Sequence, residues 1–479
     1  MDESLHDLLT KLSWDPSRDT LFLAGDVLAK STHATSLSVL KYLYTNHINA
    51  EGRQVIYPVR GNHDQMVVQW RAWRDWFERL TSSSRRHHRF LPLTTLSNLL
   101  FSTRPTSAGD KDAAAIHTGQ DFLNLIEAEW LVASTSSSSP PDPEEYIEVA
   151  RKRARGTWRA AWWARIPETP THGPDKKAWK MFSDHYWLAR DLTREEAAWL
   201  IEEVPLVNWI RSLHMFVVHA GILPADSTRD MEDRRQPLAR VPGVKRKEGQ
   251  ELEREVSWRI RRGEAAQKPL VVGEDRYVNG TATPDIGYLR GLQEEAILSQ
   301  VPQNTDPWVV LNMRSVKDSG EVTRNGDNGT PWSDIWKDAM DSCKGFGLPG
   351  EARLIEPGFT SENGEEGTLD DLSGLKKHKK YKLRCYPSTV VYGHAATRGL
   401  DVKRWSFGVD TGCLYGRRLT SLVLRAGRSG QDEDEEEEEE EDERGVLTKK
   451  IDFGDKGAGV QARLVSVRCP NPDEDEDLV

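Results

Sequence analysis

The sequence of 479 residues lacks several features that would place it in common protein classes. It has four cysteines at scattered positions, Cys343, Cys385, Cys413 and Cys469. Their spacing argues against a disulfide scaffold and against a Cys-x-x-Cys zinc site, so we expect a reducing compartment. No run approaches the ~18 uninterrupted apolar residues of a membrane span. The N-terminal residues MDESLHDLL contain no basic and apolar signal segment. These absences predict a cytoplasmic chain without a membrane segment.

The acidic excess is confined to two segments near the C-terminus. The formal net charge is −11, but Asp432 to Glu443 is an unbroken acidic run of 12 residues and Asp473 to Asp477 adds 5 more. The rest of the chain would carry a formal charge of +6. Such runs repel themselves and cannot be buried. Charge therefore does not exclude an anionic substrate, and no nucleic-acid partner is expected.

Short apolar runs alternate with helical patterns along the chain. Apolar residues at 5, 8, 9 and 12 have the spacing of an amphipathic helix. Strand-like runs follow at residues 21–24, 55–59, 215–218 and 389–392, and the last strands are expected at 405–410, 419–424 and 462–467. This alternation predicts an α/β fold.

Five regions are predicted from composition and pattern. Residues 1–80 form the N-terminal part of the core, and 81–200 form a helical, Trp-rich insert with a Ser/Pro-rich loop. Residues 201–428 complete the core and contain a long insert at 225–385. An acidic loop at 429–445 precedes a C-terminal strand and acidic tail at 446–479. We expect Trp70, Trp73 and Trp76, spaced by three, to pack onto a core rather than stack on nucleobases.

Four of the apolar runs end in a residue that can bind a metal ion: Asp26, Asn62, His219 and His394. Ligands gather at the carboxyl ends of strands in an α/β sheet, because the loops there converge on one crevice. A carboxylate, an amide oxygen and two imidazoles suit Zn, Mn or Fe better than Ca or Mg. The flanking glycines permit tight turns and close backbone approach.

The runs LFLAGD, VRGNHD, VVHAG and YGH, in this order, resemble motifs of the calcineurin-like metallophosphoesterases. GDVLAKS, HAGILP, PWSDIWKDAM, GHAATRGL and GVDTGCLYGRRLT are similar to the branch of fungal zinc-dependent endopolyphosphatases and bacterial symmetric diadenosine tetraphosphatases. The resemblance covers roughly residues 1–80 and 185–425. It implies a sandwich of two sheets flanked by helices, with the metal site at the strand ends and the helical insert as a cap.

The resemblance also implies a role for each metal ligand. Asp26 would bridge two divalent ions, and Asn62, His219 and His394 would complete the shell of the second ion. Two such cations generate a hydroxide and neutralise the phosphoryl oxygens, so that attack at phosphorus is in line.

Five further residues are assigned by the same resemblance. His63 would protonate the leaving oxygen as general acid, and Asp64 would orient or polarise His63. Lys30 matches a cation that the family keeps against the phosphate. Arg398 is a second candidate for phosphate binding, since guanidinium binds phosphate bidentately, and Arg314 is a third.

One family motif is missing from the sequence. A Gly-Asp-x-His-Gly motif on the first core strand should precede the helix that opens at Met1, and no Asp-x-His occurs in the chain. The first metal site would keep only Asp26, and the first strand of the sheet would be absent. Either the sequence starts at an internal Met, which we favour because the later motifs are intact, or the protein is a degraded, one-metal or inactive homologue. An upstream anchor would make a vacuolar location possible.

The expected function is hydrolysis of a phosphoanhydride or phosphomonoester, with inorganic polyphosphate as the first substrate. A diadenosine polyphosphate and a Ser/Thr phosphoprotein are the alternatives. The chain of 479 residues should hydrolyse little or nothing. A chain with an upstream Gly-Asp-x-His-Gly extension should be active. A polyanion-binding scaffold is the non-enzymatic alternative, and metal content separates it from an enzyme. The oligomeric state is not predicted.

Each of the remaining features allows two interpretations. Asp410 is expected to cap a turn near the site rather than bind metal, and Cys413 to be a packing residue rather than a nucleophile. The basic stretch at 376–382 is either a solvated loop or an electrostatic funnel for a polyphosphate chain. The acidic run is either a solvated loop or a mimic of a polyanion that occupies the site.

Overall fold

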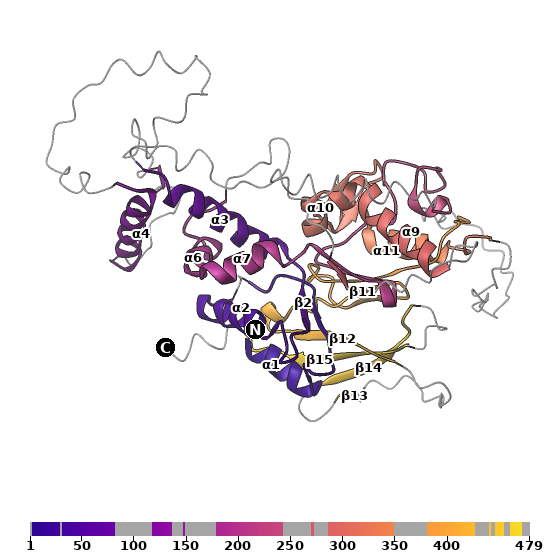
Figure 1. The fold of residues 1–479 in the computed structure, drawn as a ribbon, viewed down its shortest axis with the longest axis horizontal. Helices are drawn as coiled ribbons and strands as arrows, with labels where there is room; N and C mark the ends of the chain where they lie inside the picture. The colour runs from indigo at the N-terminus through magenta and orange to yellow at the C-terminus, as the bar shows by residue number, and fades with distance from the viewer. Residues whose placement is uncertain are drawn as a thin grey trace, which may run out of the picture. The chain divides into compact units, whose positions relative to one another are not determined.

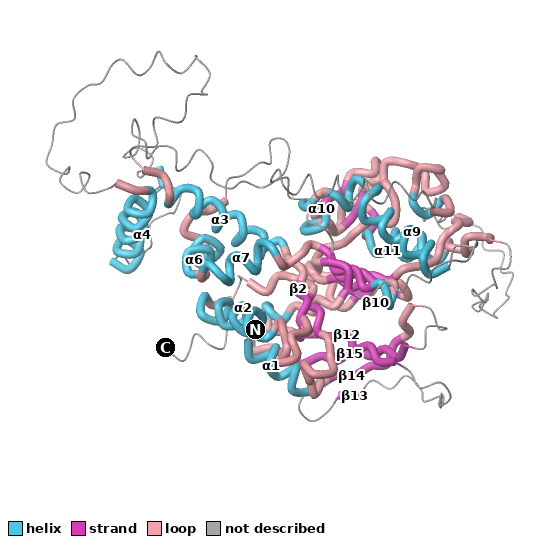
Figure 2. The backbone as a smooth tube through the Cα atoms, viewed as in Figure 1, coloured by secondary structure: helices cyan, strands magenta, loops and turns pink. Residues whose placement is uncertain are grey.

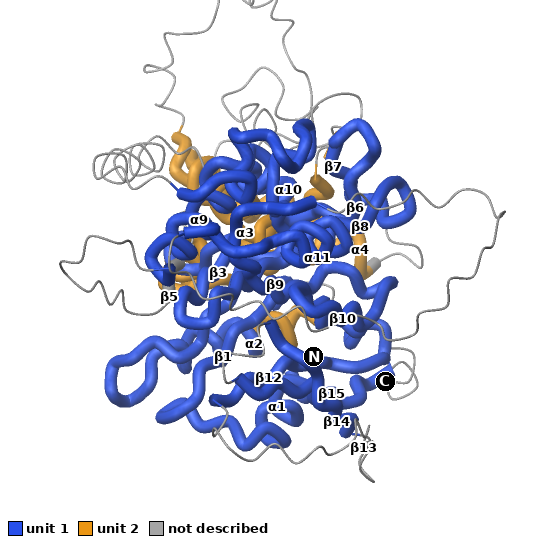
Figure 3. The backbone as a smooth tube through the Cα atoms, turned by 90° about the vertical axis from the view of Figure 1, so that its right-hand side faces the viewer, with its two compact units in different colours: residues 1–27, 38–62, 202–479 blue, residues 28–37, 63–201 orange. Residues whose placement is uncertain are grey.

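The computed structural model describes residues 2–28, 31–81, 117–136, 147–148, 179–242, 270–272, 286–348, 381–426, 440–441, 446–454 and 460–471. The chain divides into two compact units (Figure 3). Unit 1 comprises residues 1–27, 38–62 and 202–479, and unit 2 comprises residues 28–37 and 63–201. Unit 2 thus includes residues 63–80. The predicted domain boundary at residue 80 assigns these residues to the core instead. No helix among the described residues is long and apolar enough to cross a membrane.

Unit 1 is built on a six-stranded sheet in the order β10-β11-β9-β4-β3-β5. Its strands are β3 (Val207–Ile210), β4 (Met215–Val218), β5 (Leu270–Val272), β9 (Thr389–Tyr392), β10 (Asp401–Lys403) and β11 (Ser406–Gly408). Strands β4, β9 and β11 run parallel, so their carboxyl ends lie at one edge. The predicted strands at 215–218 and 389–392 and the mixed α/β fold are confirmed.

Two short strands, β1 (Leu21–Leu23) and β2 (Ile56–Pro58), form a parallel two-stranded sheet of their own. They confirm the predicted strands at 21–24 and 55–59. Strand β3 is not predicted by the pattern, because Asn208 interrupts its apolar run. The buried Asn208 amide donates to the carbonyl of Tyr57 at 3.0 Å, which ties β3 to β2.

Each face of the six-stranded sheet is covered. Alternate side chains of β4 point to opposite sides, so Phe216 joins one apolar cluster and Met215 another. Helices pack on the Phe216 side, where Trp332 and Trp336 are buried. These helices are α9 (Ile286–Gln300), α10 (Pro307–Asn312) and α11 (Trp332–Asp341) (Figure 1). A three-stranded sheet, β7-β6-β8, lies among them in the chain, with bounds Ser315–Val316, Val322–Thr323 and Thr330–Pro331 for β6, β7 and β8.

The Met215 side of the sheet shares its apolar cluster with a second, four-stranded sheet, β12-β15-β14-β13. Its strands are β12 (Arg418–Ala426), β13 (Glu440–Glu441), β14 (Leu447–Ile451) and β15 (Val460–Arg468). The other face of this sheet packs on helix α1 (Asp2–Lys11) (Figure 2). This helix buries Leu5, Leu8 and Leu9. The predicted N-terminal helix and last strands are therefore confirmed.

The described helices of unit 2 come from residues 33–46 and 62–202. They are α3 (Asn62–Glu78), α4 (Gly119–Ser136), α6 (Asp184–Asp191) and α7 (Arg194–Glu202), and helix α2 (His33–Asn46) begins in this unit. Trp70 and Trp73 are buried, as predicted for a core stripe. Thr193 and Glu196 exchange the two hydrogen bonds of a capping box at the start of α7.

The cysteines contradict the sequence-based expectation. They form two disulfides within unit 1, Cys343–Cys385 and Cys413–Cys469. The expectation of unpaired thiols is therefore wrong, because partners 42 and 56 residues apart leave no spacing pattern in the sequence. Disulfides persist in oxidising compartments, so the cysteines give no support to a reducing, cytoplasmic location.

Candidate metal centre

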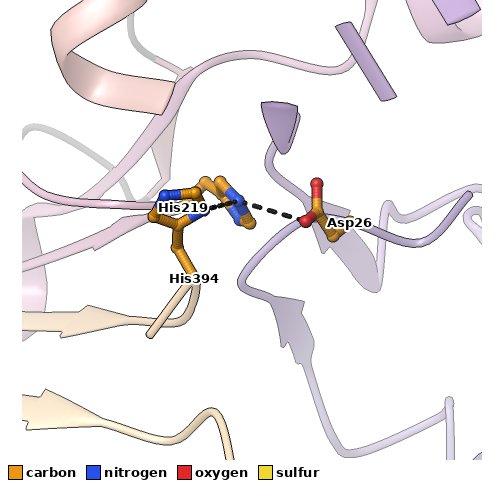
Figure 4. Close-up of side chains that lie close together, drawn as sticks. All are labelled: Asp26, His219 and His394. Carbon is orange, nitrogen blue, oxygen red and sulfur yellow. Dashed lines mark hydrogen bonds and ion pairs between the residues drawn. The ribbon is translucent and has the colours of Figure 1, made fainter. Parts of the chain in front are cut away.

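Four polar side chains meet where strands of unit 1 end. Asp26 follows β1, Asn62 follows β2, His219 follows β4 and His394 follows β9. The Nε2 atom of His219 lies 3.0 Å from Oδ1 of Asn62 and 3.1 Å from Nδ1 of His394. It lies 3.4 Å from Oδ2 of Asp26 (Figure 4). The structure thus brings together all four ligands predicted from the sequence.

The hydrogen bonding of His219 turns one ring nitrogen toward this cluster. Its Nδ1 lies 2.8 Å from the carbonyl oxygen of Ala24. Because a carbonyl only accepts, Nδ1 carries the proton and Nε2 presents its lone pair to the other three side chains. A backbone carbonyl behind a metal-binding imidazole fixes its tautomer and orientation in this way. His219 is 1% exposed, so its ring is held firmly.

The backbone around the cluster adopts unusual conformations. Asp26 and His394 have φ angles of 56° and 65°, in the left-handed region that non-glycine residues rarely occupy. Such strain persists only where the surrounding structure maintains it, and it concentrates at functional sites. Gly61 is required for a different reason, since a Cβ atom there would lie 2.0 Å from Oδ1 of Asp26. The chain therefore tolerates local strain to bring Asp26 and His394 to His219.

The donor set fits one divalent ion. Ligand atoms of Asp26, His219 and His394 all lie within 4.8 Å of one another. Asn62 adds an amide oxygen to this group. One carboxylate, one amide and two imidazoles match the mixed oxygen and nitrogen shells of Zn, Mn and Fe. An Asp-x-His motif, which would supply ligands to a second ion, does not occur in the sequence.

Asp410 lies close to the centre without joining this group. Its carboxylate accepts the backbone N–H of Gly412 at 3.1 Å, so it caps the turn as predicted. Burial raises its pKa, and its charge interacts with His219 and Asp26. Burial thus disfavours the charged form of this carboxyl beside the centre.

The two predicted catalytic residues, His63 and Asp64, belong to unit 2 and follow the ligand Asn62 directly in the chain. Nδ1 of His63 lies 2.8 Å from Nε2 of His185. Asp64 is fully buried and accepts the backbone N–H of Leu28 at 2.9 Å. It thereby holds the loop that follows Asp26. Its predicted contact with His63 stays a prediction. His185 is not predicted from the sequence, because its partner is 122 residues away.

The candidates for phosphate binding differ in their surroundings. Arg314 donates from Nη2 to the carbonyl of His394 at 3.2 Å, and its buried Nε has no hydrogen-bond partner within the described part of the chain. Arg398 lies 3.3 Å from the carboxylate of Asp401, which also binds Lys403 at 2.6 Å. Lys30 lies outside the described residues. Of the two arginines, Arg314 is held directly against His394, one of the predicted metal ligands.

Two comparisons with known proteins found a similarity. Residues 2–188 match the family model of calcineurin-like phosphoesterases. This range includes Asp26 and Asn62, and the structure adds His219 and His394 from beyond it. A curated relative from Shewanella loihica, a symmetrical bis(5'-nucleosyl)-tetraphosphatase, is 42% identical over 62 residues. That stretch is 13% of this chain and 20% of the relative, so the chain matches only a fifth of the relative's length. No solved structure is significantly similar to the chain.

Proposed function

We propose that the protein is a metal-dependent phosphoesterase of the calcineurin-like type, built on two facing sheets. The observation that carries this proposal is the convergence of Asp26, Asn62 and His394 on Nε2 of His219. Bound there, a divalent ion would polarise a phosphoryl oxygen and lower the pKa of a water molecule. The family match over residues 2–188 supports the same class of hydrolase.

Residues of the chain would bind the ion, bind the phosphate and donate a proton. Asp26, Asn62, His219 and His394 hold the ion. Arg314 neutralises phosphoryl oxygens, since its guanidinium is anchored to the carbonyl of the ligand His394. His63 delivers a proton to the leaving oxygen, as the position after Asn62 implies.

Inorganic polyphosphate is our first choice of substrate. The support is the resemblance to endopolyphosphatases in GDVLAKS and GHAATRGL, together with Arg314, which donates to the carbonyl of His394. The relative from Shewanella loihica favours a dinucleoside polyphosphate as the second choice. A Ser/Thr phosphoprotein is the third.

Metal content and hydrolysis test this proposal together. The purified chain is loaded with Zn, Mn or Fe(II), and its metal is measured by mass spectrometry. Cleavage of long-chain polyphosphate, diadenosine tetraphosphate and a phosphopeptide is then compared. We expect one ion per chain, weak hydrolysis, and stronger hydrolysis when an upstream Gly-Asp-x-His-Gly extension supplies ligands for a second ion. A metal-free chain that hydrolyses none of the three contradicts the proposal.

A polyanion-binding scaffold is the alternative from another class, because the chain lacks the Asp-x-His ligands. It predicts that polyphosphate binds with or without metal and is never cleaved, even by the extended chain. Equilibrium binding of polyphosphate with and without a chelator separates the two functions.

Arg314 and Arg398 provide a matched pair of variants. Arg314→Ala should raise KM for polyphosphate about tenfold or more, with metal content unchanged, because it removes a charge-assisted contact. Arg398→Ala should have a smaller effect, because Asp401 already compensates the Arg398 charge. An equal effect of both substitutions contradicts the assignment of Arg314 as the main phosphate contact.

A further inference from the structure

The contact between His63 and His185 lies at the start of two helices of unit 2. Nδ1 of His63, on the first turn of α3, is 2.8 Å from Nε2 of His185, on the first turn of α6. The ring centroids are 5.0 Å apart and the ring planes are inclined by 16°. Both side chains are partly buried. The imidazoles therefore meet edge to edge, as an N–H···N bond requires.

Packing between the two helices fixes this contact. Trp70 and Arg74 follow His63 by two and three helical turns, so they share its face of α3. Trp70 packs edge-to-face on Tyr186 with centroids 5.2 Å apart, and Nη1 of Arg74 lies 2.9 Å from the Tyr186 hydroxyl. Tyr186 is fully buried and adjacent to His185. The face of α3 that carries His63 is thus held against α6 over several turns.

The N···N distance identifies the contact as a hydrogen bond. At 2.8 Å, the two nitrogens are at the distance of an N–H···N hydrogen bond, in which one donates a hydrogen to the other. When His63 is in its proton-donating form, both of its nitrogens carry hydrogen. In that form His63 is the donor and neutral His185 is the acceptor.

We propose that His185 is the positioning residue of His63. By accepting the Nδ1–H of His63, it fixes the ring so that the proton passed to the leaving oxygen comes from Nε2. The N–H···N bond between the two histidines stays in place during this transfer. The leaving oxygen gains the proton that Nε2 of His63 loses. The chemical role rests on the proposed function, whereas the hydrogen bond itself does not.

The hydrogen bond is tested without reference to activity. His185→Phe keeps a flat aromatic ring and removes the acceptor, whereas His185→Gln places an acceptor oxygen near the position of Nε2. In 15N-histidine-labelled protein, we expect a solvent-protected Nδ1–H of His63 in the wild type and in His185→Gln, and its loss in His185→Phe. His33→Phe is the matched control, because it removes a 2.9 Å contact of another histidine with Asp191 of α6. It should leave the His63 resonance in place.

The effect on chemistry is tested with two leaving groups. Phenyl phosphate needs protonation of its leaving oxygen more than p-nitrophenyl phosphate does. Since general acid catalysis contributes about 10²–10⁴-fold, His185→Phe should lower kcat about 10-fold or more for phenyl phosphate and less than about threefold for p-nitrophenyl phosphate. His185→Gln should restore most of the loss.

The outcomes separate the two proposals. An unchanged His63 resonance in His185→Phe overturns the positioning role, whatever the activity. Equal losses for both substrates without rescue by His185→Gln overturn it as well. A hydrogen bond that behaves as expected, in a protein that hydrolyses neither substrate in any metal-loaded or extended form, confirms the contact and rejects the proposed function.

Discussion

The molecule contains two close histidine pairs that are built in different ways. His219 and His394 follow two parallel strands of unit 1, and their nearest nitrogens are 3.1 Å apart beside a carboxylate and an amide. His63 and His185 lie on the first turns of two helices of unit 2, and their nitrogens are 2.8 Å apart. The first pair has His394 in a left-handed backbone conformation, whereas His63 and His185 have ordinary helical geometry.

The comparison shows that proximity alone does not define a metal site. At the first pair, oxygen donors converge on the same nitrogen and a backbone carbonyl orients the ring from behind. At the second pair, the two rings meet edge to edge and helix packing fixes them. The first arrangement is suited to hold a cation, and the second to hold a proton.

The largest expected effect is on metal binding at the first pair. His219→Ala removes the atom on which the other ligands converge, so metal affinity should fall by more than the ~10–100-fold that is typical of residues behind the ligands. His185→Phe should keep its metal. Isothermal titration calorimetry with Zn or Mn measures the metal affinity of both variants. Equal metal affinity in wild type and His219→Ala would contradict the distinction between the pairs.

The next effect concerns the unit that carries the first pair. All four cysteines of the chain lie in unit 1. Replacing Cys343 and Cys385 by Ser should lower the free energy of unfolding of this unit by about 2–4 kcal/mol, because the disulfide constrains the unfolded chain. Chemical denaturation followed by metal release reports on unit 1. The non-reduced wild type should contain no free thiol, and four titratable thiols would refute the pairing.

A smaller effect is expected from two glycines that flank ligands. A Cβ atom at Gly61 would lie 2.0 Å from Oδ1 of Asp26, whereas one at Gly393 would lie 3.5 Å from its nearest neighbour, the Ala24 oxygen. Gly61→Ala should therefore displace Asp26 and weaken metal binding about 10–100-fold, as for other disturbances of ligand orientation. Gly393→Ala should bind metal as the wild type does. Similar affinities in the two variants would show that Asp26 is not a ligand.

The smallest effect is a pH dependence near the first pair, at Asp401. Burial favours the neutral form of this carboxyl, but hydrogen bonds from Lys403 and Tyr392 prevail and lower its pKa. A lowered folded-state pKa stabilises the fold above the unfolded value near 3.9, and this contribution disappears as pH falls through the folded value. Asp401→Asn should thus cost about 1 kcal/mol at pH 7, and this cost should shrink as the pH falls through the folded-state pKa. Urea denaturation over this pH range measures the change, and a pH-independent cost would contradict the ionic origin.

How well the sequence predicts a feature of this molecule depends on how far apart in the chain its interacting residues lie. Asp26, Asn62, His219 and His394 are recognisable because each follows an apolar run, and parallel strands end at one edge. His185 is not recognisable in this way, since its contact depends on how helices α3 and α6 pack. The disulfide partners are missed for the same reason, because they lie 42 and 56 residues apart in the chain. Strand β3 is missed because Asn208 interrupts its apolar run. Lys30 remains a prediction.

Anomalous diffraction from crystals grown with zinc or manganese tests the central claim most directly. We predict one strong anomalous peak within about 2.0–2.3 Å of Nε2 of His219, Nδ1 of His394 and one carboxylate oxygen of Asp26, with the Asn62 amide oxygen completing the shell. We predict no peak between His63 and His185. A peak at the second pair, or none at His219, would contradict the account.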